Sequence, residues 1–240
     1  MGELRDLSQV ERRRETVFAF VQARLGSERL PQKTIREIAG KPLIRYLLER
    51  LNMSLELAGI VVLIPEADRD SELEIACKDV PVVHGAEEDV AGRFLTGLDA
   101  FPCDAFMRIC ADSPVLDPGL ADSAVKMYHA RDKKRIKVIS TTKSGFPSGQ
   151  QVEIVNSAFY REIEPDLIDR EHVTSDLYWK YPDKVQFLPG PRCRWSKMSV
   201  DTLEDFVMIE RLVASMPEQH WEWGWFKCHQ EIERLSRQPA

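Results

Sequence analysis

The sequence predicts a single α/β domain built on a mixed, mostly parallel β-sheet. Short apolar runs of strand length alternate with segments of helical periodicity, which is the pattern of βαβ units. The 240 residues, 43% of them hydrophobic, suffice for one substantial core, and no internal repeat divides them. We expect a flexible arm over residues 1–15 and one domain over residues 16–240.

The first half of the chain contains four expected strands. Residues 16–21 are apolar on both faces and rich in β-branched and aromatic side chains, as in a strand covered by helices on both sides. Three further apolar runs share this character, and helical spacing fills the intervals between them. The strands are expected at residues 16–21, 60–64, 80–84 and 105–110, and the helices at residues 42–53, in a segment capped by Asp70, and at residues 88–100.

The alternation continues through a helix at residues 118–131 and a strand at residues 136–141. Residues 143–149 (KSGFPSG) are rich in turn-forming types and interrupt the pattern. An insertion-like segment in the second half of the domain is the simplest interpretation. Beyond the interruption we expect strands at residues 151–155, 185–188 and 198–200, and helices at about residues 169–181, 202–215 and 221–237.

The charge balance and composition argue against several classes of function. Thirty-three Lys and Arg residues stand against 39 Asp and Glu, a net charge of −6, whereas proteins that wrap nucleic acid are usually basic. No apolar run approaches the roughly 18–20 residues that span a bilayer. The five cysteines show no CxxC spacing, which indicates neither a disulfide framework nor a zinc site. We expect a cytoplasmic protein with no nucleic-acid and no membrane partner.

The loop after the first strand, residues 22–33, has the composition of an anion-binding site. It lies at the carboxyl end of a parallel strand, where ligands bind in such folds. Gly26 and Ser27 can present backbone N–H groups to a phosphate, and Arg24, Arg29 and Lys33 supply positive charge. Residues 24–50 contain seven basic and three acidic side chains, a local excess of +4. The loop matches neither a Walker motif nor GxGxxG, and its charge alone is equally consistent with a solvated basic loop.

Two aspartates follow strands that are far apart in the sequence. Asp112 comes directly after the strand at residues 105–110, and Asp201 follows the short strand expected at residues 198–200. Carboxylates at strand ends can converge on one hard cation such as Mg²⁺, which bridges phosphate oxygens in nucleotidyl transfer. Each aspartate also has a structural alternative, as a turn residue before Pro114 and as a helix N-cap respectively.

The segment QARLGSERLPQK at residues 22–33, followed by GKPL at residues 40–43, resembles the opening of the cytidylyltransferases that make CMP-activated sugar acids. The branch named after spore-coat polysaccharide biosynthesis is the most similar. The resemblance covers roughly residues 16–215, and four further motifs occur in the family's order. These are EDVAGRF at residues 88–94, RICADSPVLDP at 108–118, REHVT at 170–174 and SVDTLED at 199–205.

The resemblance implies a Rossmann-like nucleotidyltransferase fold, a GT-A-like three-layer sandwich. It implies transfer of CMP from CTP to an acidic sugar or related anionic acceptor, with release of pyrophosphate, by a Mg²⁺-dependent homodimer. Residues 143–195 would then line the acceptor site and form dimer contacts. By this comparison the catalytic residues are Arg24, Lys33, Asp112 and Asp201, with Asp112 and Asp201 as the metal ligands.

The same comparison divides the remaining candidate residues between the two substrates. For Arg93 a surface position on an amphipathic helix is an equal alternative, and for His172 a packing or capping role is the common one. The expected nucleotide-binding residues are Gln22, Ala23, Arg24, Gly26, Ser27, Lys33, Arg93 and Asp112, and the expected acceptor-binding residues are Arg108, Gln151, Glu153 and His172.

The chain departs from the family pattern at a few positions. Gln32 stands where a glycine is usual before the lysine, and a left-handed backbone there would be strained. Ala111 replaces a glycine, and Gln150 and Gln151 replace a leucine and an aspartate. The triphosphate and metal features of the family are kept while the acceptor features differ, and this pattern predicts an active enzyme with a different acceptor.

Two other functions stay open at this point. An enzyme of the same fold could use UTP, GTP or ATP with a sugar phosphate. A non-catalytic nucleotide-binding or scaffold protein could use the tryptophan-rich segment at residues 221–225 as its contact surface, although that segment could equally close the core.

Overall fold

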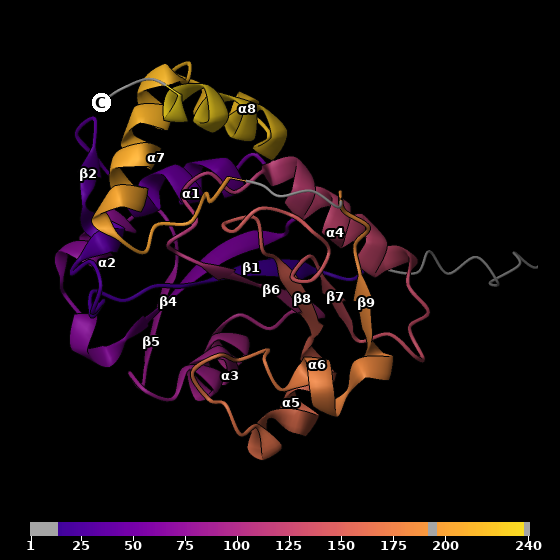
Figure 1. The fold of residues 1–240 in the computed structure, drawn as a ribbon. Helices are drawn as coiled ribbons and strands as arrows, with labels where there is room; N and C mark the ends of the chain where they lie inside the picture. The colour runs from indigo at the N-terminus through magenta and orange to yellow at the C-terminus, as the bar shows by residue number, and fades with distance from the viewer. Residues whose placement is uncertain (1–13, 192–195, 238–240) are drawn as a thin grey trace, which may run out of the picture.

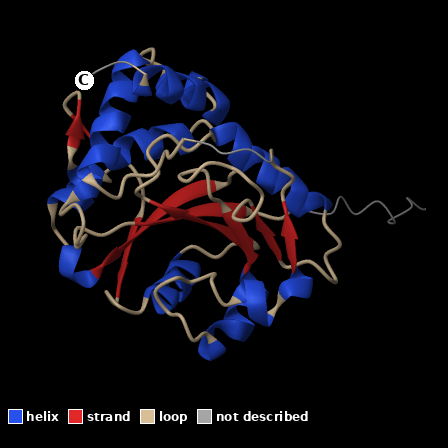
Figure 2. Ribbon diagram, viewed as in Figure 1, coloured by secondary structure: helices blue, strands red, loops and turns tan. Residues whose placement is uncertain are grey.

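A computed structural model describes residues 14–191 and 196–237 of the chain. Its main sheet has the strand order β5-β4-β1-β6-β8-β7-β9 (Figures 1 and 2). Of these strands only β8 runs antiparallel to its neighbours, so the prediction of a mixed, mostly parallel sheet is confirmed. The strands are β1 (Val17–Gln22), β4 (Gly59–Pro65), β5 (Val82–Gly85), β6 (Ala105–Cys110), β7 (Val138–Ser140), β8 (Glu153–Asn156) and β9 (Val185–Phe187).

Helices cover both faces of this sheet and complete three layers (Figure 1). The central strand β1 shows why both faces are apolar, because Ala19 and Val21 belong to the core under one helical layer while Phe20 belongs to the core under the other. One layer contains α1 (Leu43–Leu51), α2 (Glu72–Ala76), α4 (Pro118–Ala130), α7 (Leu203–Ser215) and α8 (Trp225–Ser236), and the other contains α3 (Val90–Ala100), α5 (Ser157–Ile163) and α6 (Leu177–Lys180).

A small hairpin and five 3₁₀ turns connect these elements. The hairpin joins β2 (Glu37–Ile38) to β3 (Lys41–Pro42), and the sequence patterns did not predict it. Its two-residue turn needs positive φ at both positions, and Ala39 and Gly40 have φ of 51° and 75°. The 3₁₀ turns are η1 (Lys33–Ile35), η2 (Glu66–Asp68), η3 (Glu164–Asp166), η4 (Pro182–Lys184) and η5 (His220–Glu222).

Four expected elements differ from the structure. Residues 198–200 form no strand, because their N–H groups bond to Ser148 O and Asp112 O in loops. Only Leu177–Lys180 is α-helical within residues 169–181, whereas α5 was not predicted. Ser71, not Asp70, caps α2, and the final helix begins at Trp225, after η5.

The tryptophan-rich segment closes the core beside α1. Arg50, fully buried in α1, donates to the backbone oxygens of Leu116, His220 and Trp223. Trp223 and Trp225 pack against a hydrophobic cluster that is formed by side chains of α7 and α8 together with Leu43 of α1. Of the two alternatives for this segment, core closure is the one that these contacts favour.

Residues 1–13 of the expected arm lie outside the described residues. The next residues are held by ion pairs, since Arg14 contacts Glu56 and Glu15 contacts Arg131 and Lys133. Among the helices that the structure describes, none has the length and apolar character needed to cross a membrane.

Candidate functional site

A cavity of about 510 Å³ opens at the carboxyl ends of β1 and β6. Its volume lies within the usual range for small-molecule sites. Gln22 ends β1, Cys110 ends β6, and both line the cavity. Most of the predicted site residues also line it: Gln22, Ala23, Arg24, Ser27, Lys33, Arg93, Arg108, Asp112, His172 and Asp201. Gly26, Gln151 and Glu153 do not.

The loop at residues 22–33 is fixed by three contacts with its surroundings. The Asp68 carboxylate accepts a hydrogen bond of 2.9 Å from Leu25 N, and Thr34 Oγ1 donates to Arg24 O at 3.2 Å. Gln32 N donates to Leu25 O at 3.2 Å and closes the loop. Gln32 adopts φ 56°, so the left-handed conformation anticipated from the family's glycine is present.

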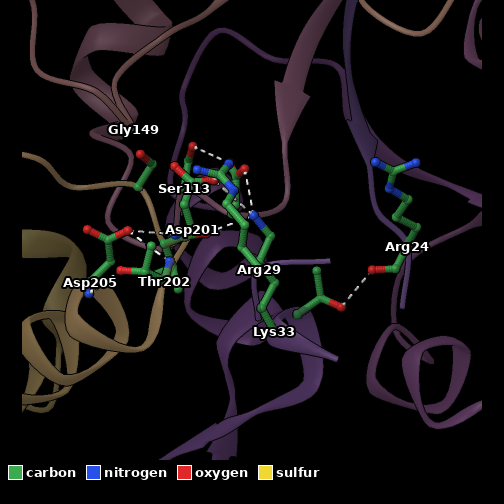
Figure 3. Close-up of polar contacts among 12 residues, drawn as sticks. Arg24, Arg29, Lys33, Ser113, Gly149, Asp201, Thr202 and Asp205 are labelled. Atoms are coloured by element: carbon green, nitrogen blue, oxygen red, sulfur yellow. Dashed lines mark hydrogen bonds and ion pairs between the residues drawn. The ribbon is translucent and has the colours of Figure 1, made fainter. Parts of the chain in front are cut away.

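The Lys33 ammonium is within hydrogen-bonding distance of both Asp112 and Asp201. Figure 3 shows Lys33 beside Asp201. Lys33 Nζ is 2.8 Å from Val200 O, 3.1 Å from Asp112 Oδ2 and 3.4 Å from Asp201 Oδ1. Val200 N donates to Asp112 O at 2.8 Å, and this backbone bond brings the two aspartate-bearing segments together. The convergence expected from the strand ends is therefore observed, although residues 198–200 are not a strand.

Gly149 holds the segment before Asp201 at close range. It has φ 89°, and a Cβ atom built on it would lie 2.6 Å from the carbonyl carbon of Met198. No side chain fits in that space, so the close approach requires glycine. The neighbouring Gln150 is fully buried, and its amide bonds to Asp117 N and Val115 O, which follow Asp112 in the chain. Residues 149–150 thus support both aspartate segments.

The N-cap alternative for Asp201 is wrong. Thr202 caps α7 in a capping box with Asp205, which leaves the Asp201 carboxylate to other partners. Arg29 Nη2 lies 2.8 Å from Asp201 Oδ1, and Lys197 Nζ lies 2.9 Å from Oδ2. Burial opposes ionisation of this carboxyl, but the hydrogen bond from Lys197 and the charges of Lys33, Lys197 and Arg29 hold its pKa below the usual value.

Arg93 is buried with unused hydrogen-bonding capacity. Its Nε and Nη1 atoms have no hydrogen-bond partner among the described residues, and only 2% of the residue is exposed. Burial lowers the pKa of its guanidinium, and the nearby charge of Arg24 lowers it further. The alternative of a surface arginine is therefore wrong. A buried arginine on the cavity wall with free N–H groups is a donor that a ligand can satisfy.

Arg108 joins the cavity floor to a buried polar network. It donates to Gln22 Oε1 at 3.0 Å and pairs with Glu153 Oε2 at 2.7 Å. Thr174 and Tyr178 also donate to Glu153. Burial opposes ionisation of Glu153, but the Arg108 charge and these hydrogen bonds keep its pKa below the usual value. Glu153 therefore positions Arg108, and of these two residues only Arg108 lines the cavity.

The other predicted acceptor residues lie in two different places. His172 is exposed at the cavity edge, with Nδ1 3.1 Å from Asp169 Oδ2. Beside it, Glu171 Oε1 pairs with Arg24 Nη2 at 3.0 Å. Gln151 turns back to its own loop, where its amide bonds to Gly149 N and Pro147 O. Its acceptor-binding role stays a prediction.

Sequence reasoning gave no role to Glu28, Glu171, Lys197 and Asp205, and it gave Arg29 only a share of the positive charge around a phosphate. Arg29 and Glu171 line the cavity, and Lys197 and Asp205 form the outer part of the aspartate cluster. Arg29 carried a signal, because it lies in the basic loop at residues 22–33. Lys197 carried none, since its place beside Asp201 follows from the irregular backbone of residues 198–200.

The oxygen atoms around Lys33 Nζ are of the kind that a hard divalent cation binds. Two carboxylates and one backbone carbonyl, all within 3.4 Å of Nζ, converge there. No group of three or more His, Cys, Asp or Glu side chains with metal-binding geometry occurs among the described residues. The donor set thus fits Mg²⁺, which usually takes one or two protein carboxylates and completes its shell with water and substrate phosphates.

Comparisons with known proteins place this chain in a family. The sequence profile described as Cytidylyltransferase matches residues 18–238, which is most of the chain. The chain belongs to the cytidylyltransferase family. Among the curated relatives of this cytidylyltransferase, the spore coat polysaccharide biosynthesis protein SpsF of Bacillus subtilis is 28% identical over 219 residues, covering 85% of this chain and 88% of SpsF. A 3-deoxy-manno-octulosonate cytidylyltransferase of Acidobacterium capsulatum is 30% identical over 105 residues, 42% of each chain.

Solved structures show the same fold. A cytidylyltransferase from Leptospira borgpetersenii superposes with a TM-score of 0.85 at 22% identity, covering 94% of this cytidylyltransferase and 99% of that chain. A CMP:2-keto-3-deoxy-manno-octonic acid synthetase complexed with CTP gives a TM-score of 0.64 at 15% identity, covering 83% and 99% respectively. The predicted nucleotidyltransferase fold is therefore confirmed.

Proposed function

We propose that this cytidylyltransferase transfers CMP from CTP to an acidic sugar, releasing pyrophosphate. The observation that carries the proposal is the convergence of Lys33, Asp112 and Asp201 at one edge of a cavity whose wall contains Arg93 with unpartnered N–H groups. Lys33, Asp112 and Asp201 together bind phosphate and its counter-ion, and Arg93 binds a base or a sugar. The name of one relative, 3-deoxy-manno-octulosonate cytidylyltransferase, supports CTP and an acidic sugar as the substrates, and the name of SpsF supports a role in polysaccharide biosynthesis.

In the proposed complex the basic loop holds the triphosphate. Arg24 and Lys33 neutralise its charge, and Ser27 and Gly26 offer backbone N–H groups. Arg93 donates its free N–H groups to the acceptor atoms of cytosine or ribose, which removes the energetic penalty of leaving them unpaired. Asp112 and Asp201 would hold Mg²⁺, whose charge would neutralise the phosphates when it is bound.

The acceptor is expected on the Arg108 side of the cavity. Arg108, fixed by Glu153 and Gln22, orients an acceptor oxygen, and His172 lies at the open edge. A hydroxyl oxygen of the acceptor attacks the α-phosphorus in line, the bond to the β-phosphate oxygen breaks, and pyrophosphate leaves. The hydroxyl proton passes to solvent, and no side chain is assigned as its base. Positioning and charge neutralisation account for most of the catalysis.

The direct test is pyrophosphate release from CTP and Mg²⁺ over a panel of sugar acids, amino sugars and phosphonates. We expect release with at least one sugar acid, and Asp112→Asn should lower kcat/KM by on the order of 10²–10³. Asp79→Asn, at an exposed carboxylate outside the cavity, is the matched control and should retain activity. Binding of Mg²⁺–CTP by the wild-type protein no tighter than by Asp112→Asn would refute the proposal.

Nucleotide competition separates CTP from the other triphosphates in the same experiment. If UTP, GTP or ATP displaced CTP and supported release with a sugar phosphate, the nucleotide assignment would be wrong. Tight CTP binding without release from any acceptor would contradict the transfer reaction and favour a nucleotide-binding protein. The homodimer and the cytoplasmic location stay predictions.

A further inference from the structure

The Lys33 ammonium occupies the point where a divalent cation would contact both aspartates. Its three oxygen neighbours come from Asp112, Asp201 and the Val200 backbone, at 2.8–3.4 Å. The side chain is 14% exposed, so it is held between these groups. An ion placed between the two carboxylates must take the position of this ammonium. In this arrangement the cation between the two carboxylates is the Lys33 ammonium.

The charges around the Lys33 ammonium are balanced. Asp112, Asp201 and Asp205 contribute three negative charges, and Arg29, Lys33 and Lys197 contribute three positive charges within ion-pairing distance. Both oxygens of Asp201 already have cationic partners, with Arg29 and Lys33 on Oδ1 and Lys197 on Oδ2. A divalent ion would raise the charge of this cluster to about +2, which Coulomb repulsion at these distances opposes.

A triphosphate changes that balance in two ways. It adds several negative charges to the cavity, and it offers oxygen partners to the lysine. Lys33 is the last residue of the loop at residues 22–33 and lines the same cavity as Arg24 and Ser27. Its flexible four-carbon stem lets the ammonium move while the η1 backbone stays in place. The phosphate oxygens and the aspartates thus compete for one ammonium.

We propose that Lys33 is a built-in substitute for the divalent cation, released by the triphosphate, so that metal and CTP bind with strong positive coupling. The inference rests on the proposed function, because it takes CTP and Mg²⁺ as the ligands. By thermodynamic reciprocity, the factor by which CTP strengthens metal binding equals the factor by which the metal strengthens CTP binding. The metal alone binds weakly, since it must displace Lys33 unaided.

The test measures binding of Mn²⁺ by the loss of its free-ion EPR signal, first with the metal alone. Lys33→Met keeps an apolar stem and removes the charge, so we expect it to bind Mn²⁺ about tenfold or more tightly than the wild type does. Adding Asp112→Asn to this variant should abolish the gain and so locate the ion. Lys41→Met is the matched control, because Lys41 pairs with Glu49 outside the cavity, and its Mn²⁺ affinity should equal that of the wild type. Equal affinity of Lys33→Met and the wild type would overturn the proposal.

The second measurement repeats the titration with a saturating α,β-methylene analogue of CTP, after correction for the metal–nucleotide complex in solution. The wild type should gain about tenfold or more in Mn²⁺ affinity, and Lys33→Met should gain much less. If Lys33→Met does not fold, the wild-type titrations decide the question, and independent binding of metal and analogue would overturn the proposal. Failure of the analogue to bind at all would refute the proposed function, whereas the metal-alone comparison would still test the substitution by Lys33.

Discussion

Gln32 shows how one residue of the loop at residues 22–33 can hold a strained backbone conformation. Its backbone has φ 56° and ψ 26°, a conformation in which a residue with a Cβ atom is about 1–2 kcal/mol less stable than in the right-handed region. The side chain is exposed and makes no capping hydrogen bond. The sequence comparison anticipated this conformation, because a glycine is usual at this position in the family. The hydrogen-bond partners of the next residue, Lys33, could not be predicted in the same way, because they depend on where the side chains lie.

Replacing Gln32 by glycine should therefore stabilise the protein. The relief of strain is partly offset by the greater backbone freedom of glycine in the unfolded chain, so we expect Gln32→Gly to raise the free energy of unfolding by about 0.5–1 kcal/mol. Gln219→Gly is the matched control, because Gln219 has φ −78° and has no strain to release, and this variant should be less stable than the wild type. Urea titration measures both, and a stability loss of the same size in both variants would contradict the interpretation.

At the scale of the elements, the sequence predicts those strands and helices whose apolar residues follow a clear periodic pattern. Strand β6 occupies Ala105–Cys110 as expected, because a run that is buried on both faces has an unambiguous pattern. Asp112 follows the end of this strand as expected, whereas Asp201 reaches it through the bond from Val200 N to Asp112 O and not from a strand end. The conformation of residues 198–200 could not be predicted in this way, since their alternating apolar side chains imitate a strand while their backbone bonds to two loops. The ion pair between Lys197 and Asp201 depends on that irregular backbone, and the sequence could not predict it.

Arg50 of α1 holds the C-terminal segment in place through hydrogen bonds. It forms no ion pair with any of the described residues. It is fully buried and donates to three backbone oxygens, and burial lowers its pKa. Arg50→Met leaves those carbonyls without a donor, and we expect a loss of about 3–5 kcal/mol in the free energy of unfolding. Arg45→Met, on the same helix, removes a pair with the exposed Asp79 and should lose less than about 1 kcal/mol. Equal losses in urea titrations would show that Arg50 does not fasten this segment.

On the scale of the whole molecule, the cavity and the ion pairs of Glu15 lie at opposite ends of strand β1. The cavity is at the carboxyl ends of β1 and β6, whereas Glu15 lies just before the amino end of β1. There its two carboxylate oxygens accept hydrogen bonds of 3.0 Å from Arg131, and Lys133 lies at 2.9 Å. Because β1 is central to the sheet, this contact ties the entry of the chain to α4. Its loss should affect stability and leave the cavity intact.

The pH dependence of stability tests this separation. The hydrogen bond from Arg131 lowers the pKa of Glu15 from 4.5 to about 2, against the opposing effect of burial and with help from Lys133. Since the folded-state pKa is the lower one, the stabilisation is complete above pH 4.5 and is lost as the pH falls towards 2. Allowing for solvent screening, Glu15→Gln should cost about 1–2 kcal/mol at pH 7, and its difference from the wild type should shrink below pH 4.5. Urea titrations at pH 7 and pH 3 measure the difference at about 25 °C, with Glu218→Gln as the control at an exposed carboxylate. A pH-independent difference, or a change in pyrophosphate release at pH 7, would contradict the assignment of Glu15 to anchoring alone.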